Sequence, residues 1–528
     1  MRSVLIDKER GVNGSRMFSG LIDALKLKVR NFILRGVQAN MADLKFVEKE
    51  IAEWKFSAQR IKQIKAFRYY DGDHDIIKRK RKMIGEDGKL QDVDNLPNNR
   101  IIDNQYAKMV NQKANYLFGK PFTIKGENEA YIELLKKVFD KKFMRTLKSA
   151  GKAAYNGGIA WLYPYYNDKG EFDFKLFPAY EILPFWKDSE HTELEFFVRV
   201  YRTTVYEWGR RKMIEKVEVY DLNGIHLFIL DGEKLIPDMA KPKDGDVPYV
   251  TVMDSERNIT KMNWSRIPLI PLKVNEQEIP LLKKVKSLQD GINVMLSDFQ
   301  NNMQEDARNT ILVLKNYDGT NLGEFRHNLA TYGAIKIRYD GDTKGGVETL
   351  EIKVNAENYK VILEIFKKAL IENAMGYDAK DDRLSGNPNQ MNIQSMYSDI
   401  DTDANDMETE AQAAFDEILW FVNAHLANVG EGNFDGEEVQ VIFNRDMLMN
   451  ESDIITNCQN SQGILSDETI ISMHPWVDDP QAEMERLEKQ KQKERVEFER
   501  QYDPFGQQQK QNPEAPNQGK QGGGIDEE

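Results

Sequence analysis

Apolar and polar positions follow two different rhythms along the chain, first helical and then strand-like. Apolar residues recur every three or four positions over 44–67, 103–117 and 128–153, which is typical of helices packed on one face. From 159 to 274 the alternation is strand-like, and it begins on both sides of a predicted hairpin turn at Asn167–Gly170. The pattern therefore predicts an α+β body that ends near residue 274.

A single long helix is predicted next, from Pro280 to Ala307. Its apolar positions step by 4, 3, 4, 3 and 4 residues, a heptad-like spacing that predicts packing against neighbouring helices. These seam residues are Leu281, Val285, Leu288, Ile292, Met295 and Phe299. Gly291 lies in the middle of the helix and costs about 1 kcal/mol relative to alanine, so we expect a neighbouring backbone to approach closely there.

A compact α/β stretch, 308–354, separates this helix from the next. It contains a predicted strand, a short helix at 322–329 and a hairpin around Asp340–Gly341. The second helix is predicted over 356–375, with Asn355 as its N-cap and Gly376 at its C-cap.

The C-terminal third begins with a polar loop over 378–390 that is rich in turn formers. A long acidic helix over 393–426 and a short strand follow. Residues 451–475 are predicted to be helical, with Ser466 as an N-cap, and Pro480 begins a last, strongly charged helix. The end of the chain, 504–528, is rich in Gln, Gly and Pro and is predicted to be disordered.

Composition narrows the class of protein. The 528 residues suffice for three or four domains, and the net charge of −13 disfavours a tight grip on the phosphates of nucleic acid. A single cysteine, Cys458, excludes a disulfide framework or a cysteine-based zinc site within one chain. No run of about 18 apolar residues occurs, so a membrane span is not expected.

Residues 1–40 form a separate N-terminal extension. Apolar residues fall at helical spacing between Phe18 and Ile33, with Lys26, Lys28 and Arg30 among them. A basic amphipathic helix of this kind can lie on a membrane surface, but docking on its own protein is the favoured interpretation.

Catalytic and cofactor motifs are missing from the sequence. There is no phosphate-binding GxxxxGK[ST] loop, and the six histidines are scattered. Residues 399–410 place Asp399, Asp401, Asp403, Asn405 and Glu410 at EF-hand positions. However, Ala404 occupies the position that needs glycine, so an acidic, solvated helix face is predicted instead of calcium binding. We therefore expect a protein without cofactor, metal or enzymatic activity.

Six stretches occur in an order that resembles the siphophage-type family of tailed-phage portal proteins, over residues 42–490. They are FRYYDGDHDI, NNRIIDNQYAKMVNQKANYLFGKPF, YNGGIAWLYPYY, IPLIPLKVNEQEIP, KVKSLQDGINVMLSDFQNN and SDETIISMHPWVDDPQAEMERL. The resemblance implies a homo-oligomeric ring, usually of twelve subunits, at one vertex of the phage head. Double-stranded DNA passes through its channel.

The resemblance also divides the chain into parts. It implies an α+β wing (41–279, continued in a long helix and strand over 391–450), two stem helices (280–307 and 355–377), a small α/β clip (308–354), a tunnel loop (378–390) and a helical crown (451–503). The N-terminal extension 1–40 and the tail 504–528 lie outside these parts.

Site residues and partners follow from the same resemblance. The tunnel loop would bring Lys380, Arg383, Asn387, Asn389 and Gln390 towards the DNA, and the seam of the first stem helix would pack within and between subunits. Gly291 would allow close packing in the ring, and Asn301, Asn302 and Gln304 would border the channel or the next subunit. The implied partners are terminase, a head-completion adaptor, and capsid and scaffolding proteins, in a virion assembled in the host cytoplasm. Two other readings stay open: another structural protein of the head–tail connector, or a nucleic-acid enzyme of the packaging machinery.

Overall fold

The computed structural model describes most of the chain between residues 41 and 502. The described ranges are 41–84, 88–92, 96–207, 209–238, 246–253, 259–306, 311–315, 323, 327, 339–340, 343–344, 346–350, 356–380, 390–445, 451–477 and 480–502. They fall into two compact units, one within 1–379 and 396–447 and the other within 380–395 and 448–528.

Short helices open the first unit, and capping side chains separate them. They are α2 (Met41–Lys55), α3 (Ala58–Tyr70), η1 (Asp75–Lys78), α4 (Gln105–Phe118), α5 (Glu129–Val138) and α6 (Lys141–Gly157). Ser57 caps α3 and Asp140 caps α6, so the predicted helices 44–67 and 128–153 are each divided in two. A side-chain oxygen that accepts from the first free N–H groups starts a new helix at these points.

Antiparallel sheets make up the rest of the body. A six-stranded sheet has the order β10-β9-β8-β7-β6, with β11 paired to β9, and a three-stranded sheet has the order β14-β4-β5. The strands of the first sheet are β6 (Ile182–Trp186), β7 (Leu194–Glu207), β8 (Arg210–Asp221), β9 (Gly224–Asp231), β10 (Lys234–Pro237) and β11 (Asp246–Val247). Those of the second are β4 (Ile159–Tyr166), β5 (Phe172–Phe177) and β14 (Ile270–Lys273). The predicted hairpin at Asn167–Gly170 joins β4 to β5 and is confirmed.

Several two-stranded pairs and one short helical turn complete the strand-rich parts. They are β1 (Lys82–Ile84) with β2 (Leu90–Asp92), β3 (Thr123–Gly126) with β19 (Val439–Ile442), β12 (Val250–Met253) with β13 (Ile259–Met262), β15 (Ile311–Lys315) with β18 (Gly346–Leu350), β16 (Tyr339–Asp340) with β17 (Thr343–Lys344), and the turn η2 (Ala179–Glu181). The predicted short helix at 322–329 lies almost entirely outside the described residues.

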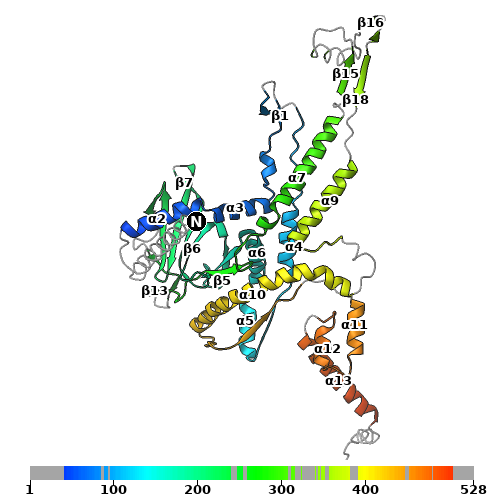
Figure 1. Cartoon of the computed structure of the whole chain (residues 1–528). Coiled ribbons are helices and arrows are strands. Elements are labelled where there is room, and N and C mark those ends of the chain that lie inside the picture. Colours follow the sequence, from blue (N-terminus) through cyan, green and yellow to red (C-terminus); the bar gives the residue numbers. More distant parts are fainter. Residues whose placement is uncertain are drawn as a thin grey trace, which may run out of the picture. The chain divides into compact units, whose positions relative to one another are not determined.

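Two long helices, α7 (Leu281–Asp306) and α9 (Ala356–Asn373), run side by side and connect the body to the β15–β18 pair (Figure 1). We call this pair the two-helix arm. The N-terminal half of α7 belongs to the main hydrophobic core of the body, which also contains residues of α4, α6 and α10 (Gln390–Val429). Mixed helix and sheet content confirms the α+β class.

The second unit is helical where it is described. It contains α11 (Glu451–Asn460), α12 (Asp467–Met473) and α13 (Pro480–Tyr502). Ser466 accepts from the Thr469 N–H and begins α12, as predicted. Among the described helices of the chain, none combines the length and the apolar character that crossing a bilayer requires.

Candidate functional site

The apolar seam of α7 is buried within its own chain. Leu281 is 3% exposed, Val285 and Ile292 are 0% exposed, and Leu288 packs against the same core. Higher on the arm, the rings of Phe299 and Tyr359 lie 5.1 Å apart, and Met295 lines a cavity of about 350 Å³ beside Tyr359. All six seam residues therefore have neighbours inside the subunit, and Ile292 has no surface left for another one.

Gly291 makes room for a side chain of the second arm helix. A Cβ atom at this position would lie 2.8 Å from Cε2 of Phe366, closer than real Cβ contacts come. A close approach was predicted here, but from a neighbouring backbone and in the ring. The structure places a phenylalanine side chain of α9 there instead, so within the chain Gly291 serves the α7–α9 contact.

The other side of α7 carries a column of buried polar side chains that the seam analysis missed. Gln289, Asn293 and Ser297 are 0% exposed and Asn301 is 3% exposed. They recur every four residues, which sets them in one row along the helix. We call this row the polar ladder, because each member accepts a hydrogen bond from a different backbone N–H of one segment.

That segment is 98–106, which runs from an irregular stretch into the first turn of α4. The Asn99 N–H donates to Asn301 Oδ1 (2.7 Å), Ile101 N–H to Ser297 Oγ (2.9 Å), Asp103 N–H to Asn293 Oδ1 (3.0 Å) and Tyr106 N–H to Gln289 Oε1 (2.8 Å). Four helical residues rise about 6 Å and two extended residues about 6.6 Å, so the rungs at 99, 101 and 103 stay in register. The last step, from 103 to 106, takes three residues because the segment turns into α4 there. The ladder thus ties α7 to the body along its length.

Charged pairs support the ladder at its edges. Arg79 pairs with Asp298 of α7 at 2.9 Å, and Asp103 pairs with Lys367 of α9 at 2.7 Å. Asn301, Asn302 and Gln304 were expected to border the channel or the next subunit. In the structure Asn301 and Gln304 accept from the Asn99 side chain, and the Asn302 side-chain amide donates to the Tyr359 hydroxyl (3.2 Å), so all three bond within the chain.

A buried histidine lies behind the ladder. The Asn293 side-chain amide lies 2.7 Å from His74 Nδ1, and His74 Nε2 lies 2.9 Å from the Tyr69 carbonyl oxygen. A ring nitrogen beside a carbonyl oxygen donates, so Nε2 carries the proton and Nδ1 accepts from Asn293. Burial lowers the pKa of His74, which favours this neutral form.

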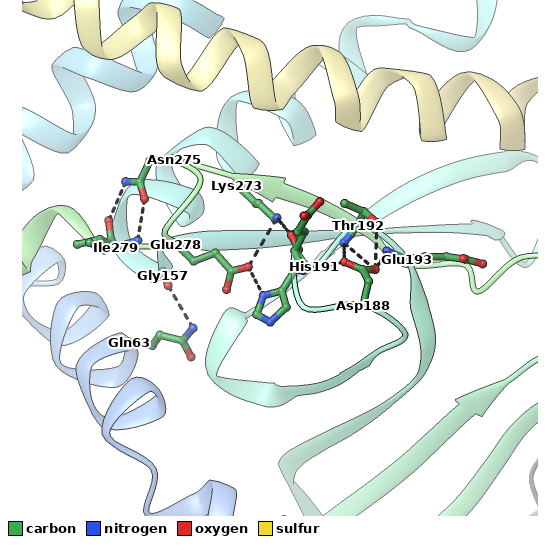
Figure 2. Close-up of polar contacts among 11 residues, drawn as sticks. Gln63, Gly157, Asp188, His191, Thr192, Glu193, Lys273, Asn275, Glu278 and Ile279 are labelled. Atoms are coloured by element: carbon green, nitrogen blue, oxygen red, sulfur yellow. Dashed lines mark hydrogen bonds and ion pairs between the residues drawn. The ribbon is translucent and has the colours of Figure 1, made fainter. Parts of the chain in front are cut away.

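The loop that leads from β14 into α7 is fixed by a cluster of polar contacts (Figure 2). His191 Nδ1 and Glu278 Oε1 are 2.7 Å apart, and Lys273 Nζ lies 3.9 Å from the same oxygen. Both His191 (φ 58°) and Glu278 (φ 53°) have left-handed backbones, which are unfavourable for residues with side chains. The cluster joins the β6–β7 turn to the start of the arm.

Two neighbouring residues, Gly158 and Asp188, allow the backbone geometry at Glu278 and His191. Gly158 has a φ of 79°, and a Cβ there would lie 2.0 Å from the carbonyl oxygen of Glu278, so only glycine fits. In the β6–β7 turn, Asp188 accepts from the backbone of Thr192 and Glu193. Desolvation opposes the shift, but these backbone bonds lower the pKa of Asp188 to about 2, so it is charged over the whole physiological range.

The chain leaving α9 is anchored on α4. Met375 (φ 52°) takes the left-handed position at the end of the helix, and the N–H of Gly376 donates to the Ile371 carbonyl. The predicted cap at Gly376 is therefore wrong by one residue. A Cβ at Gly376 would lie 2.8 Å from both Met109 Sδ and Gln112 Oε1, so these side chains would have to shift to admit one. The side-chain amide of Gln112 binds the Tyr377 backbone twice: it donates to the Tyr377 carbonyl oxygen (2.8 Å) and accepts from the Tyr377 N–H (3.2 Å).

A buried ion pair lies next to the Gln112–Tyr377 contact on α4. Lys113 Nζ is 2.8 Å from Asp403 of α10 and 3.1 Å from the Met375 carbonyl oxygen, and the Tyr155 hydroxyl donates to Asp403. Burial lowers the pKa of Lys113 to about 8, although Asp403 acts against the shift. One charge pair thus connects α4, α6, α10 and the end of α9.

The predicted loop residues are only partly described. Arg383, Asn387 and Asn389 lie outside the described residues, Lys380 is exposed, and Gln390 is the first residue of α10. Residues 399–410 lie within the continuous helix α10, as predicted. The expectation of a solvated acidic face is wrong at Asp403, which is buried. Asp401 and Asn405 contact Arg445 there, and Asp403 contacts Lys113. Within the described residues, no group of three His, Cys, Asp or Glu side chains is placed to hold a metal ion.

Comparison with known proteins identifies the family of this chain. The family described as "Phage portal protein, SPP1 Gp6-like" matches residues 48–497. The chain belongs to this family. It is 29% identical to the portal protein of Bacillus phage SPP1 over 81% of this chain and 83% of that protein. It is 26% identical to the portal protein of Clostridium phage phiCD119 over 82% of this chain and 94% of that protein.

Solved structures add a distant likeness. A chain of the virion of a native gene transfer agent particle matches 69% of this chain and 87% of its own length, with a TM-score of 0.37 and 11% identity. That likeness is too remote to bear on the assignment. Family membership gives the function at the level of the particle: the chain is a portal component at the head–tail connection of a phage, found in the virion as a homo-oligomer.

Proposed function

We propose that this chain forms the ring-shaped channel at one vertex of the phage head, through which double-stranded DNA is packaged and later ejected. In this proposal α7 and α9 are the stem, the residues between them are the clip, the α+β body is the wing, and α11 to α13 are the crown. The clip receives the terminase during packaging and a head-completion adaptor afterwards, while capsid and scaffolding proteins surround the ring during assembly in the host cytoplasm.

The polar ladder carries this proposal. A stem must transmit force between a motor at one end and a body held in the capsid, so its helices must not slide along their axes. A purely apolar seam tolerates sliding, because apolar contacts are non-directional. Four directed hydrogen bonds at successive turns of α7 fix its axial position, since a shift by one residue would break all of them.

The outer face of α9 offers the surface for ring contacts. Val361 is 49% exposed, Ile362 41% and Ile365 57%, whereas the α7 seam faces inward. Apolar side chains grouped on an exposed helix face indicate a protein contact. Ring closure between identical chains needs a heterologous contact of this kind, with a different surface of the next copy as partner.

The DNA-facing element is the loop over 378–390. The backbone of Tyr377, just before this loop, is bound through its carbonyl oxygen and its N–H by the side-chain amide of Gln112, so the attachment point of the loop is fixed. Lys380 and Arg383 accompany three aspartates, and the chain as a whole carries a net charge of −13. DNA must slide, and a nearly neutral loop touches phosphates without accumulating the salt-dependent affinity of many retained contacts. No enzymatic step and no cofactor belong to this function.

Assembly and packaging test the proposal separately. Native mass measurement of the purified chain should give a closed ring near twelve subunits, and Ile365→Glu should leave folded single subunits. Ile292→Asp would not test ring assembly, because Ile292 is 0% exposed within its own chain and a charge there would unfold the subunit itself. Deletion of Leu384–Asn389 should keep the ring but impair head filling. Normal filling by that variant, or a monomeric wild-type chain that hydrolyses nucleotides, would refute the proposal.

A further inference from the structure

A cavity of about 390 Å³ lies between α2 and the β6–β7 turn, away from the arm. Its lining combines aromatic side chains with the carboxylates of Glu50, Asp188 and Glu195. The aromatic members are Phe46, Phe185, Trp186, Phe196 and the imidazole ring of His191. Asp188 stays ionised because backbone N–H groups hold its pKa near 2 against desolvation. An aromatic cavity with acidic walls suits an occupant that is both apolar and positively charged.

The cavity also adjoins the edge of the large sheet. Strand β6 stands at the end of the strand order and pairs only with β7 in it, and four of its residues line the cavity. Natural proteins cover or interrupt such edges, because an exposed strand edge pairs with other chains. Pro184 interrupts this edge, and an occupant of the cavity would cover it.

The N-terminal segment 1–40 has the matching chemistry. It holds eight of the chain's 73 basic residues but only three of its 86 acidic residues, so it is basic within an acidic protein. Its apolar residues between Phe18 and Ile33 fall at helical spacing, and four of its cations, Lys26, Lys28, Arg30 and Arg35, lie among or just after them.

The segment also starts from the right place. It ends at residue 40, and α2 begins at Met41 and contributes Phe46 and Glu50 to the cavity wall. Five helical residues separate Met41 from Phe46, a rise of about 7.5 Å. A segment of 40 residues easily returns over that distance, and the short tether raises its local concentration at the cavity.

We propose that segment 1–40 docks in this cavity of its own chain, through apolar side chains of 18–33 and the cations at 26–35. The docked segment covers the β6 edge and places its cations beside the acidic wall. This inference does not rest on the channel function, because it uses only the lining of the cavity and the chemistry of segment 1–40.

Hydrogen exchange on the full-length protein tests the docking. We expect slow exchange of amides in 18–35, and about a tenfold loss of that protection in Glu50→Lys and in a variant with Lys26, Lys28, Arg30 and Arg35 changed to glutamate. Glu53→Lys is the matched control, because Glu53 is exposed on the same helix α2 and does not line the cavity. Protection should be retained in this control and weakened by high salt.

Zero-length carbodiimide cross-linking identifies the occupant. The proposal predicts links from Lys26 or Lys28 to Glu50 within one chain. In mixed ¹⁴N and ¹⁵N assemblies, isotopically mixed links would assign the cavity to a neighbouring copy and overturn the proposal. So would unprotected exchange of 18–35 in the wild type, equal protection in Glu50→Lys, or protection that requires added vesicles of phosphatidylcholine and phosphatidylglycerol.

Discussion

The two buried faces of α7 solve the same problem in opposite ways. Towards the core and α9 the helix presents an apolar seam, in which Val285 and Ile292 are 0% exposed. Towards segment 98–106 it presents amides and a hydroxyl that are equally buried, and each of them accepts a backbone N–H. Ile292 and Asn293 are neighbours in sequence with the same exposure. Ile292 is held by apolar packing, whereas Asn293 is held by directed hydrogen bonds.

The difference follows from what each face covers. The backbone N–H and C=O groups of α9 hydrogen-bond within the helix, so its contact with α7 needs only side chains of complementary volume. Segment 98–104 is neither helix nor strand, so its backbone N–H groups must find acceptors elsewhere. The α7 side chains provide them. The apolar face therefore contributes the burial of apolar surface, while the polar face fixes the axial position. This contrast leads to four predictions.

The largest effect is expected from replacing a rung of the ladder with an apolar residue of similar size. Asn293→Leu leaves the Asp103 N–H and His74 Nδ1 buried without partners, at about 1–3 kcal/mol each. Ile292→Leu, one residue earlier, should cost less than about 1.5 kcal/mol. Urea unfolding of both variants measures the difference. Equal losses would mean that the polar face is no more specific than the apolar one.

The next effect concerns the closest contact of the apolar face. In Gly291→Ala the new Cβ meets Phe366 at 2.8 Å, and overpacking costs about 1–3 kcal/mol. A gain of about 1 kcal/mol in helix propensity offsets part of this cost. Adding Phe366→Leu should restore stability beyond the sum of the single effects in a double-mutant cycle. Strict additivity would show that Phe366 moves aside freely.

The third effect is a pH dependence from the polar face. The folded-state pKa of His74 is lowered by burial, so below about pH 6.5 the unfolded chain takes up a proton that the folded chain refuses. Stability contributed by His74 is present above that pH and is lost as the pH falls, by at most about 1.4 kcal/mol per unit.

Asn293→Asp should reverse the sign of this contribution. A carboxylate beside Nδ1 raises the pKa of His74, so the stabilisation is present at low pH and lost as the pH rises. Urea midpoints of wild type and variant at pH 5.5 and 7.5 give the two slopes. Slopes of the same sign in both proteins would place the titration elsewhere, for example at His425, whose pKa burial also lowers.

The smallest effect is expected at the rim of the ladder. Arg79 and Asp298 are each 37% exposed, so Asp298→Asn should cost only about 0.2–1 kcal/mol and the difference should disappear at high salt. A larger, salt-independent loss in unfolding experiments would show that this pair belongs to the buried ladder and not to its edge.

Local pattern alone located most elements of the arm and the body. The 4-3-4 spacing of apolar residues predicted α7, whose start at Leu281 is one residue after the predicted Pro280, and Ser466 predicted the start of α12. The predicted end of α7 at Ala307 lies outside the described residues. The turn at Asn167–Gly170 predicted the β4–β5 hairpin. These features depend on neighbours in sequence, where backbone geometry and capping leave few alternatives. The breaks at Ser57 and Asp140 were missed, because apolar spacing continued across them.

The element order, the apolar seam and the family resemblance could all be predicted from the residues alone, and the family match confirmed the resemblance. What each face of α7 contacts could not be predicted, because it depends on the packing of distant segments. Gln289, Asn293, Ser297 and Asn301 recur every four residues, a visible signal, but polar residues at helical spacing are usually solvated. Their burial depends on segment 98–106, almost 200 residues earlier, whose free N–H groups need acceptors. Likewise, Gly291 signalled a close approach but not Phe366, because the partner in a long-range contact is chosen by the packing of the whole chain.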